Sequence, residues 1–390
     1  MVGERLKQLR LARGWSLEAL AAEVGGVVSR QAIWKYEHGR ANPSAYVLTR
    51  LASALGVKSV ALWAEPNVRV ELVAYRKRSR LTKKEQEQTE SFVRQTLEER
   101  VALQNVMGQT PDVDLPIRSL HIGSVEEAEA AAEVLRTKWV LGVDPIANVV
   151  NVLESHLVHV VEIPTSDHFD GLSAVAYDSE GDAVAAAVVS RDGVSGERQR
   201  LNLCHELGHL VLDIAEGVDP EKAAFRFGSA FLAPVGELLR QVGRTRGALT
   251  LPELLMLKRQ FGMSVQALLY RLRELEVITD QHYKQWCIDI NQMGYRKAEP
   301  APVPPEEPQW LRQSVLHALA EGLTTKEEAE RLLGGFVEGV PDLSLDGRRN
   351  YMQLPAEERR RILEEQAARF VSHYERDTSW RDIQGGDIDE

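Results

Sequence analysis

The chain has 390 residues, 44% of them hydrophobic and 27% charged, which is the composition of a globular protein with room for two or three domains. No apolar run approaches the roughly 20 residues that span a bilayer, and the N-terminus has no apolar signal-peptide core, so we expect a cytoplasmic protein with no membrane partner. The only two cysteines, Cys204 and Cys287, exclude a disulfide framework.

The formal net charge of −11 is unevenly distributed along the chain. Residues 1–84 hold 16 Lys and Arg against 6 Asp and Glu, a charge of +10, which leaves −21 on the other 306 residues. A basic N-terminal part on an acidic body indicates one module that faces nucleic acid, not a chain that binds nucleic acid over its whole surface.

Residues 1 to about 64 predict about five short helices. Ser16 is placed to cap the second, and Ser29 the third, which we expect to run from Arg30 to His38. Two short helices joined by a tight glycine-containing turn form a helix-turn-helix, whose second helix enters the major groove. Side chains on and just after that helix are the predicted DNA contacts, to bases or to phosphates: Ser29, Arg30, Gln31, Trp34, Lys35, Arg40 and Asn42. The alternative is a small helical bundle without DNA affinity.

The run from Val28 to Ser44 resembles the recognition-helix region of XRE/Cro-type repressors. The resemblance implies a DNA-binding domain over residues 1–66 that commonly acts as a dimer on two half-sites. Trp34 stands where that family often has a small polar residue, so the family's base preference does not carry over to this chain.

Residues 67–123 predict a strand, a basic cluster and a long helix. The strand is expected at Val68–Tyr75 and the basic cluster, Arg76–Arg80, directly follows it. The cluster forms either a solvated face or additional phosphate contacts. The helix, Lys83–Met107, has apolar residues at helical spacing and serves either as a connector or in dimerisation: Phe92, Val93, Leu97 and Val101.

From Ser124 onward, helical and extended patterns alternate. Two helices are expected first, at 128–139 and 144–156, followed by a strand at 157–163. The apolar runs 171–177 and 183–190 flank a turn and predict a hairpin. A sheet edge beside the next helix is a place where an extended substrate can add as a strand.

That next helix contains the sequence Leu203-Cys204-His205-Glu206-Leu207-Gly208-His209, and we expect Asn202 to cap it. Positions i and i+4 lie on one helix face, so His205 and His209 can bind one metal ion. Glu206 can reach a water held on that metal. Two histidines and a general base in this spacing are typical of zinc hydrolases, and a chance pair of surface histidines is the alternative. Cys204 points to another face of the helix and is expected to be a packed thiol.

A catalytic zinc takes three protein ligands and keeps one position open. The residues alone leave three candidates for the third ligand. Glu221 lies on a following helix after a proline, Asp213 lies four residues after His209 on the expected helix face, and Glu216 is close in sequence.

The segments Arg198–Leu212 and Glu221–Pro234 resemble the ImmA/IrrE metallopeptidase family. The second segment is similar to the family pattern E-x-E-A-N-x-F-A-x-x-L-L-M-P, but Ala223 and Phe225 replace the second Glu and the Asn. Glu221 is the carboxylate that matches. The resemblance therefore implies a zinc peptidase core over residues 124–240, with Zn²⁺ held by His205, His209 and Glu221 and with Glu206 as the catalytic base.

The remaining residues predict a mostly helical C-terminal region. Its expected parts are a helical extension of the peptidase (241–298), a Pro/Glu-rich linker (299–308), a small helical hairpin (309–335), and a linker with an amphipathic helix at 355–374 and an acidic tail (336–390).

The expected fold is α+β and multidomain: an all-α helix-turn-helix domain, a zincin-like peptidase domain with a small sheet and the H-E-x-x-H helix, and a helical C-terminal extension. The resemblances imply a DNA-binding stress or mobile-element regulator whose zinc endopeptidase cleaves a specific repressor or antitoxin-like protein. Double-stranded DNA, that protein substrate and a second copy of the chain are the expected partners. The competing hypothesis is a transcriptional regulator whose peptidase fold senses metal or ligand without turnover, and a toxin–antitoxin-like operon is compatible with either.

Overall fold

The computed structural model describes residues 2–63, 67–75, 82–109, 115–164, 169, 171–296, 298–335 and 352–361. The chain divides into two compact units, residues 1–313 and 314–390. The basic cluster at 76–80, most of the predicted helix at 355–374 and the acidic tail lie outside the described residues.

The N-terminal part is a small helical bundle. Its elements are α1 (Val2–Ala12), α2 (Leu17–Glu23), α3 (Arg30–Glu37), α4 (Ala45–Ala54) and the short 3₁₀ helix η1 (Ser59–Leu62). The expected caps are confirmed, because Ser16 Oγ accepts from the Ala19 amide at 3.1 Å and Ser29 Oγ from the Ala32 amide at 3.2 Å. The bundle is closed by buried aliphatic side chains from every helix: Leu6, Leu9, Leu20, Ile33, Leu51 and Leu62.

A buried ion pair fixes the third helix of the bundle against the first. Arg10 on α1 donates from Nε and Nη2 to the two carboxylate oxygens of Glu37 at 2.6 and 2.8 Å. A bidentate pair of this kind has a defined geometry, so it orients as well as attaches the helix. The predicted recognition helix, α3, therefore has its inner face held and its outer face exposed.

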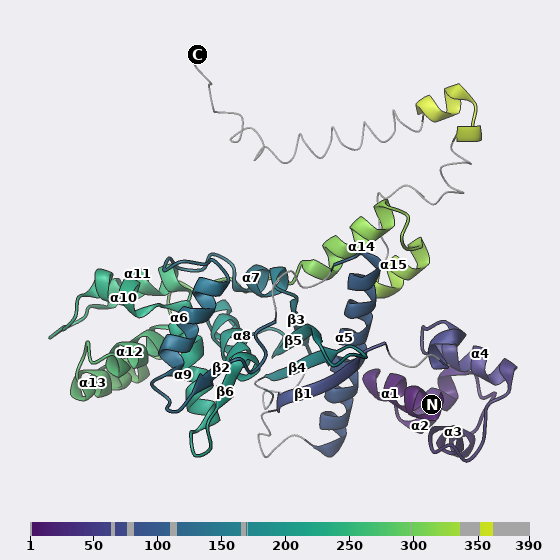
Figure 1. Ribbon diagram of the computed structural model, residues 1–390, viewed down its shortest axis with the longest axis horizontal. Coiled ribbons are helices and arrows are strands. Elements are labelled where there is room, and N and C mark those ends of the chain that lie inside the picture. The colour runs from purple at the N-terminus through teal and green to yellow at the C-terminus, as the bar shows by residue number, and fades with distance from the viewer. Residues whose placement is uncertain are drawn as a thin grey trace. The chain divides into compact units, whose positions relative to one another are not determined.

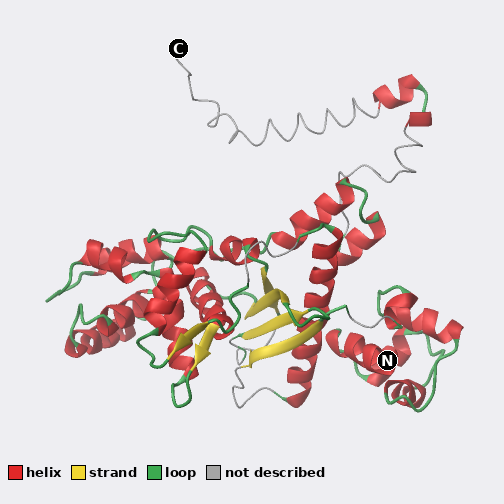
Figure 2. Cartoon of the chain, viewed as in Figure 1, coloured by secondary structure: helices red, strands yellow, loops and turns green. Residues whose placement is uncertain are grey.

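A four-stranded mixed sheet forms the centre of the next part (Figures 1 and 2). Its strands lie in the order β1-β4-β5-β3, with bounds β1 (Arg69–Tyr75), β3 (Val158–Ile163), β4 (Leu172–Tyr177) and β5 (Ala183–Arg191). The predicted hairpin is confirmed as the antiparallel pair β4–β5, while β3 pairs with β5 in parallel. The strand at 69–75 was also expected, and it pairs antiparallel with β4.

Helices cover both faces of this sheet (Figure 1). Helix α5 (Lys83–Val106) packs Val93, Leu97 and Val101 against one face, in a cluster that includes Val70 of β1. Its apolar stripe is thus part of the core, and the helix also contacts α1, where Arg5 pairs with Glu98; its expected use as a connector or in dimerisation stays a prediction. The opposite face carries α8 (Gly196–Val211), the helix that contains the two histidines.

Helix α8 begins earlier than the sequence suggested. Ser195 is its N-cap, and Asn202 lies inside the helix, so the expectation that Asn202 caps it was wrong. The Ser195 side chain makes no capping hydrogen bond; instead the Gly196 amide donates to the Val303 carbonyl at 3.1 Å. The first turn of the helix is therefore satisfied by a segment more than 100 residues away in sequence.

That segment, residues 298–309, is called the strap below. It has no helix or strand, yet its backbone and side chains bond to α8 and α11. Glu306 pairs with Arg200 and its amide donates to Gln199 Oε1 at 2.7 Å. Glu299 accepts from Lys258 Nζ at 2.9 Å, and Lys258 also pairs with Glu197. The strap is thus an ordered part of the peptidase-like unit.

The remaining elements surround α8 or follow it. They are β2 (Leu120–Ile122), α6 (Ala128–Lys138), α7 (Val149–Ser155), β6 (Leu212–Ile214), α9 (Pro220–Leu232), α10 (Val235–Val242), α11 (Leu251–Phe261), α12 (Val265–Glu274) and α13 (Asp280–Gln292). Strands β2 and β6 form a separate two-stranded parallel sheet. Helix α7 starts later than predicted because the Asn148 side chain caps it, accepting from the Asn151 amide at 2.7 Å.

The C-terminal region is helical as far as it is described. Helix α14 (Trp310–Ala320) is followed by α15 (Lys326–Leu333), which Thr325 caps and Gly334 ends, and residues 356–361 form a further helical stretch. The architecture is therefore mixed α+β, with a helical N-terminal module, a sheet-containing part and a helical C-terminal region. None of the helices in the described part of the chain is long and apolar enough to cross a membrane.

Candidate metal centre and DNA-binding surface

His205 and His209 face the same point from one side of α8. Their Nε2 atoms are 3.0 Å apart, and both side chains are about 6% exposed. The apolar side of the same helix, with Leu203, Leu207 and Leu210, is buried in the core. Because that side is anchored, the histidine side is fixed in direction, as the i, i+4 spacing predicted.

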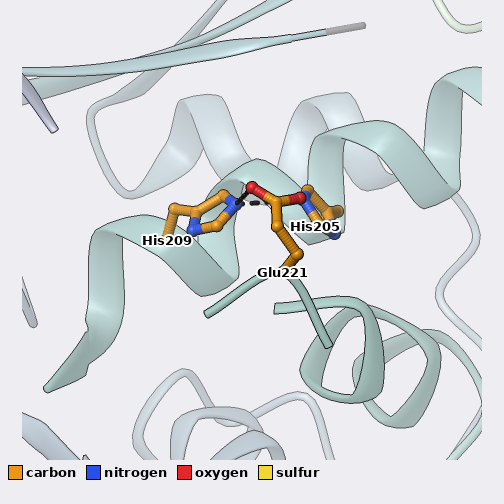
Figure 3. Close-up of side chains that lie close together, drawn as sticks. All are labelled: His205, His209 and Glu221. Carbon is orange, nitrogen blue, oxygen red and sulfur yellow. Dashed lines mark hydrogen bonds and ion pairs between the residues drawn. The ribbon is translucent and has the colours of Figure 1, made fainter. Parts of the chain in front are cut away.

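Glu221 completes the cluster from the first turn of α9 (Figure 3). Its two carboxylate oxygens lie 3.5 Å from His205 Nε2 and 3.5 Å from His209 Nε2. Asp219 caps this helix, accepting from the Glu221 amide at 3.0 Å, so the turn that carries the carboxylate is itself held. The Glu221 side chain is 48% exposed, which means that the cluster opens to solvent on this side.

Two glycines allow α8 and α9 to approach closely enough for this convergence. A Cβ at Gly208 would lie 3.1 Å from Ala224 Cα, and one at Gly228 would lie 2.9 Å from the His205 backbone nitrogen. Neither position can take a side chain without moving a backbone. The close contact of the two helices therefore sets the distance from Glu221 to the histidines.

The three groups fit a zinc ion by both chemistry and spacing. Neutral imidazole nitrogen and carboxylate oxygen are common zinc ligands, and ligand atoms about 2.1 Å from a tetrahedral zinc lie roughly 3.4 Å from one another. The observed separations of 3.0, 3.5 and 3.5 Å are close to that value. Among the described residues, these three form the one cluster of metal-binding side chains, with candidate ligand atoms within 4.8 Å of one another.

The other two carboxylates considered for the third position lie elsewhere. Helix α8 ends at Val211, so Asp213 falls on β6 and not on the histidine face of the helix. There its Oδ2 lies 2.8 Å from Nδ1 of His121 on β2. Glu216 lies in the turn after β6 and is exposed, outside the cluster.

Glu206 follows His205 on α8, and its side chain is buried against the start of β4. Ser173 Oγ donates to Glu206 Oε2 at 2.6 Å and also lies 3.1 Å from the Glu206 carbonyl oxygen. A Cβ at Gly171 would lie 2.2 Å from Glu206 Oε1, so the carboxylate passes directly over the backbone there. The carboxyl group is thus held by β4 as well as by its own helix.

Ser173 and Gly171 were not identified from the sequence as site residues. Both lie more than 30 residues before Glu206, and a serine in an apolar strand gives no local signal. The one indication in the sequence is the strand pattern itself, since a buried hydroxyl requires a hydrogen-bond partner. Cys204, by contrast, behaves as expected: it is fully buried, and burial raises the pKa of its thiol to about 12.

A buried charge cluster lies behind the carboxylate ligand. Glu129 on α6 accepts from Arg226 Nε of α9 at 2.8 Å and from Arg271 Nη2 of α12 at 2.6 Å. Burial favours the neutral form of Glu129, but the bonds and charges of the two arginines outweigh it and hold the pKa of Glu129 below its usual value. The cluster ties α9 to its neighbours one turn beyond Glu221.

The predicted DNA-contacting side chains gather around α3. Ser29, Arg30, Gln31 and Lys35 are exposed on the helix and its cap, and Arg40 and Asn42 are exposed in the segment that follows. In this structure Arg30 Nε lies 2.7 Å from Glu18 Oε1 on α2, so an acidic neighbour occupies that arginine.

Trp34 differs from the other residues of this group because it is half-buried and in contact with two other side chains. Its ring stacks on His38 with centroids 4.3 Å apart, and the Arg40 guanidinium lies 4.7 Å from its ring centroid. The tryptophan thus supports Arg40 through a cation–π contact. The structure gives this residue a local role that a small polar side chain could not have.

Comparison with known families identifies two of the parts. Residues 6–62 match the helix-turn-helix family, and residues 177–273 match a peptidase family described as IrrE N-terminal-like domain. The second match begins at the last residue of β4 and contains α8 and α9. Both resemblances drawn from the sequence are confirmed for these stretches: the chain carries an XRE-type helix-turn-helix domain and an IrrE-like domain.

A curated protein is similar to the N-terminal part of the chain. It is the SPbeta prophage-derived uncharacterized HTH-type transcriptional regulator YonR of Bacillus subtilis (strain 168), 42% identical over 59 residues. The similarity covers 15% of this chain and 53% of that protein, so the chain matches about half of the relative's length.

Proposed function

We propose that this chain is a transcriptional regulator with a zinc-dependent endopeptidase, which cleaves a specific repressor or antitoxin-like protein in the cytoplasm as part of a stress or mobile-element programme. The observation that carries the proposal is the convergence of His205, His209 and Glu221, with Glu206 next to His205 in α8 and hydrogen-bonded to Ser173. Three ligands plus an adjacent carboxylate are the requirements of a zinc hydrolase.

In this proposal each residue has a separate task. His205, His209 and Glu221 would hold the zinc, and the bound ion would supply Lewis-acid activation of the scissile carbonyl and of water. Glu206 would act as the general base and then as the general acid toward the leaving amine. Ser173 keeps the Glu206 carboxylate directed at the reacting atoms.

DNA binding is assigned to residues 1–66. In the proposal Gln31 reads a base edge, and Arg30 does so after it leaves Glu18. Arg40, which contacts Trp34, binds phosphate together with Asn42. Ser29 and Lys35 complete the contact surface. Recognition by a pair of copies on two half-sites fits a module of this type. Peptidase activity is assigned to the 124–240 core together with α5 and the strap.

The test begins with metal content. The purified wild-type chain should contain about one zinc, and the His205→Ala variant should lose it. If the purified protein contained no zinc and bound none when zinc was added at neutral pH, the peptidase proposal would be overturned.

Catalysis is then separated from metal binding with Glu206→Gln. This variant should keep its zinc and lose cleavage of the partner protein, which can be sought by expressing the chain with its genomic neighbours and following their size. The substitution retains the size and the hydrogen-bonding oxygen of the side chain but removes the base.

The same variant tests the competing function, a sensor that binds zinc or a small ligand without turnover. The presence of all three ligands and of the base favours the enzyme. If Glu206→Gln leaves regulation of the target promoter unchanged, the sensor is the better description. Loss of regulation together with loss of cleavage supports the peptidase.

A further inference from the structure

The sheet edge at which a substrate strand was expected to add is already occupied. Strand β4 has β5 on one side and β1 on the other. Strand β1 pairs antiparallel with β4 from Arg69 opposite Tyr177 to Tyr75 opposite Leu172, with a register shift at Val73. It belongs to neither matched segment, since these cover residues 6–62 and 177–273. It comes from the connection between the DNA-binding and peptidase parts.

The register brings β1 past the proposed general base. Ser173, which bonds to Glu206, lies opposite Ala74, and the neighbouring pair is Leu172 with Tyr75. Contacts between α8 and β1 agree with this placement. A polypeptide in the position of β1 therefore runs antiparallel to β4 and passes beside the part of the strand that holds Glu206. That is the path expected for an extended substrate added to this edge.

The two faces of β1 show what chemistry the position accepts. Val70 is buried in the cluster between the sheet and α5, and Leu72 packs against the same cluster. On the other face Arg69 and Glu71 pair with each other and remain largely exposed, at 67% and 47%. The position accepts an extended segment with apolar residues at alternate positions, whereas its other face tolerates charge.

The pairing is interrupted where β1 nears the base. The register shifts between Leu72 and Ala74, which leaves Val73 as an extra residue on β1. A bulge disrupts the ladder locally, so the end of β1 beside Ser173 is held by fewer regular hydrogen bonds than the rest. A competing strand can begin to pair at this end.

We propose that β1 is a pseudosubstrate strand: it occupies the β4 edge in the direction and register of a substrate, and the natural substrate is a protein segment of alternating apolar character that displaces it. The effect of β1 on cleavage rests on the proposed peptidase function. The exchange of β1 for another strand does not depend on that function. The peptidase is then closed in the resting chain and opens when β1 leaves β4.

The probe is a fluorescein-labelled peptide with the sequence of residues 67–75, added to the full-length, zinc-loaded chain in the Glu206→Gln background. Strand release is produced by Glu71→Pro. The Val70 carbonyl accepts from Arg94 on α5, so we expect the Glu71 amide to face β4, and proline removes that donor. Glu71→Ala is the matched control, because it loses the same side chain and keeps the amide.

A disulfide between β1 and β4 holds β1 in place. It is made by Arg69→Cys together with Tyr177→Cys, in a chain that also carries Cys287→Ser. Directly opposite residues of antiparallel strands have Cα atoms about 4.5–5.5 Å apart, within the range of a disulfide. The lock is closed with oxidised glutathione and opened with dithiothreitol.

Fluorescence anisotropy should show the peptide binding to Glu71→Pro at least about tenfold more tightly than to Glu71→Ala, and binding should be lost in the oxidised lock and restored by reduction. Equal affinity of the peptide for the oxidised and for the reduced disulfide variant would overturn the proposal, and this comparison stands even if Glu71→Pro fails to fold.

Cleavage is tested in chains that carry the native Glu206. There, faster cleavage of the partner protein by Glu71→Pro supports the link to catalysis. If the peptide binds only when β1 is released but no partner protein is cleaved, the peptidase function is refuted and the exchange of strands stands. If the oxidised and the reduced disulfide variant cleave the partner protein equally fast, the pseudosubstrate role of β1 is refuted.

Discussion

At the scale of single residues, the site depends on side chains whose neighbours come from different elements. Glu221 is the least buried of the three proposed ligands, yet its position is set by the Asp219 cap and by the absence of side chains at Gly208 and Gly228. Its role can therefore be tested without disturbing the core.

We expect Glu221→Ala to weaken zinc binding by about 100-fold or more, because loss of an outer partner of a ligand already costs 10–100-fold. Asp213→Ala should bind zinc as the wild type does, since Asp213 pairs with His121 on the separate β2–β6 sheet. Competition with a chromogenic chelator measures both. If the Asp213 variant lost zinc and the Glu221 variant kept it, the proposed ligand set would be incorrect.

The role of a residue could be predicted from the sequence where its partners lie within a few residues of it along the chain. Ser16 and Ser29 are helix caps whose acceptors bond to amides three residues on, and both were predictable for that reason. The i, i+4 histidines are equally local. Ser173 and Gly171 could not be predicted as neighbours of Glu206, because their proximity arises from the packing of β4 on α8.

At the scale of elements, the peptidase-like unit is held by ion pairs between helices. Glu129 joins α6 to α9 and α12 through Arg226 and the fully buried Arg271. Since α9 carries Glu221, this cluster supports the metal site as well as the fold. Removing one member of a buried network leaves its partners without a counter-charge.

Glu129→Gln should lower the free energy of unfolding by about 3 kcal/mol at neutral pH, measured by urea denaturation of the metal-free chain. The folded-state pKa of Glu129 is lower than its unfolded value, so its contribution is present above pH ~4.5 and is lost as the pH falls through the folded-state pKa. The difference from wild type should therefore shrink towards pH 3. Glu126→Gln, an exposed glutamate nearby, should change little at either pH. A difference that stayed constant from pH 7 to pH 3 would contradict this account.

Element types were more predictable than their boundaries and partners. The strand at 69–75 and the helix at 83–106 follow from periodicity, but nothing in their residues says that they join the sheet beside β4 and cover its face. Helix α8 begins at Gly196 because the strap accepts the amide of its first residue, a long-range contact that cap residues do not encode. Asp213 was misplaced for a related reason: the helix ends at Val211, where the chain turns to pair with β2.

At the scale of the whole molecule, two activities are proposed for one chain, and they use separate residues. The proposed DNA-binding surface lies on α3 and the segment after it, and the candidate metal ligands lie on α8 and α9. The charges follow the same division, with the excess of Lys and Arg confined to the first 84 residues. Each activity should therefore be removable while the other remains.

Arg40→Ala should weaken binding to a mixed-sequence 30-base-pair duplex and lower the slope of log affinity against log salt by about 0.9, the value for one phosphate contact. Arg259→Ala, which removes the same charge from an exposed position on α11, should leave the slope unchanged, and so should Glu206→Gln. Titrations at several salt concentrations measure these slopes. An equal effect of Arg40→Ala and Arg259→Ala would show that only net charge matters.

The strap has a consequence for how the molecule comes into being. The helix-turn-helix bundle is complete once residue 62 has left the ribosome, whereas α8 receives the partners of its first turns only when residues 298–309 have emerged. At about 5–20 residues per second, translation separates these events by roughly 10–50 s. During that interval the nascent chain already displays a finished DNA-binding module, while the metal site still lacks the segment that anchors its main helix.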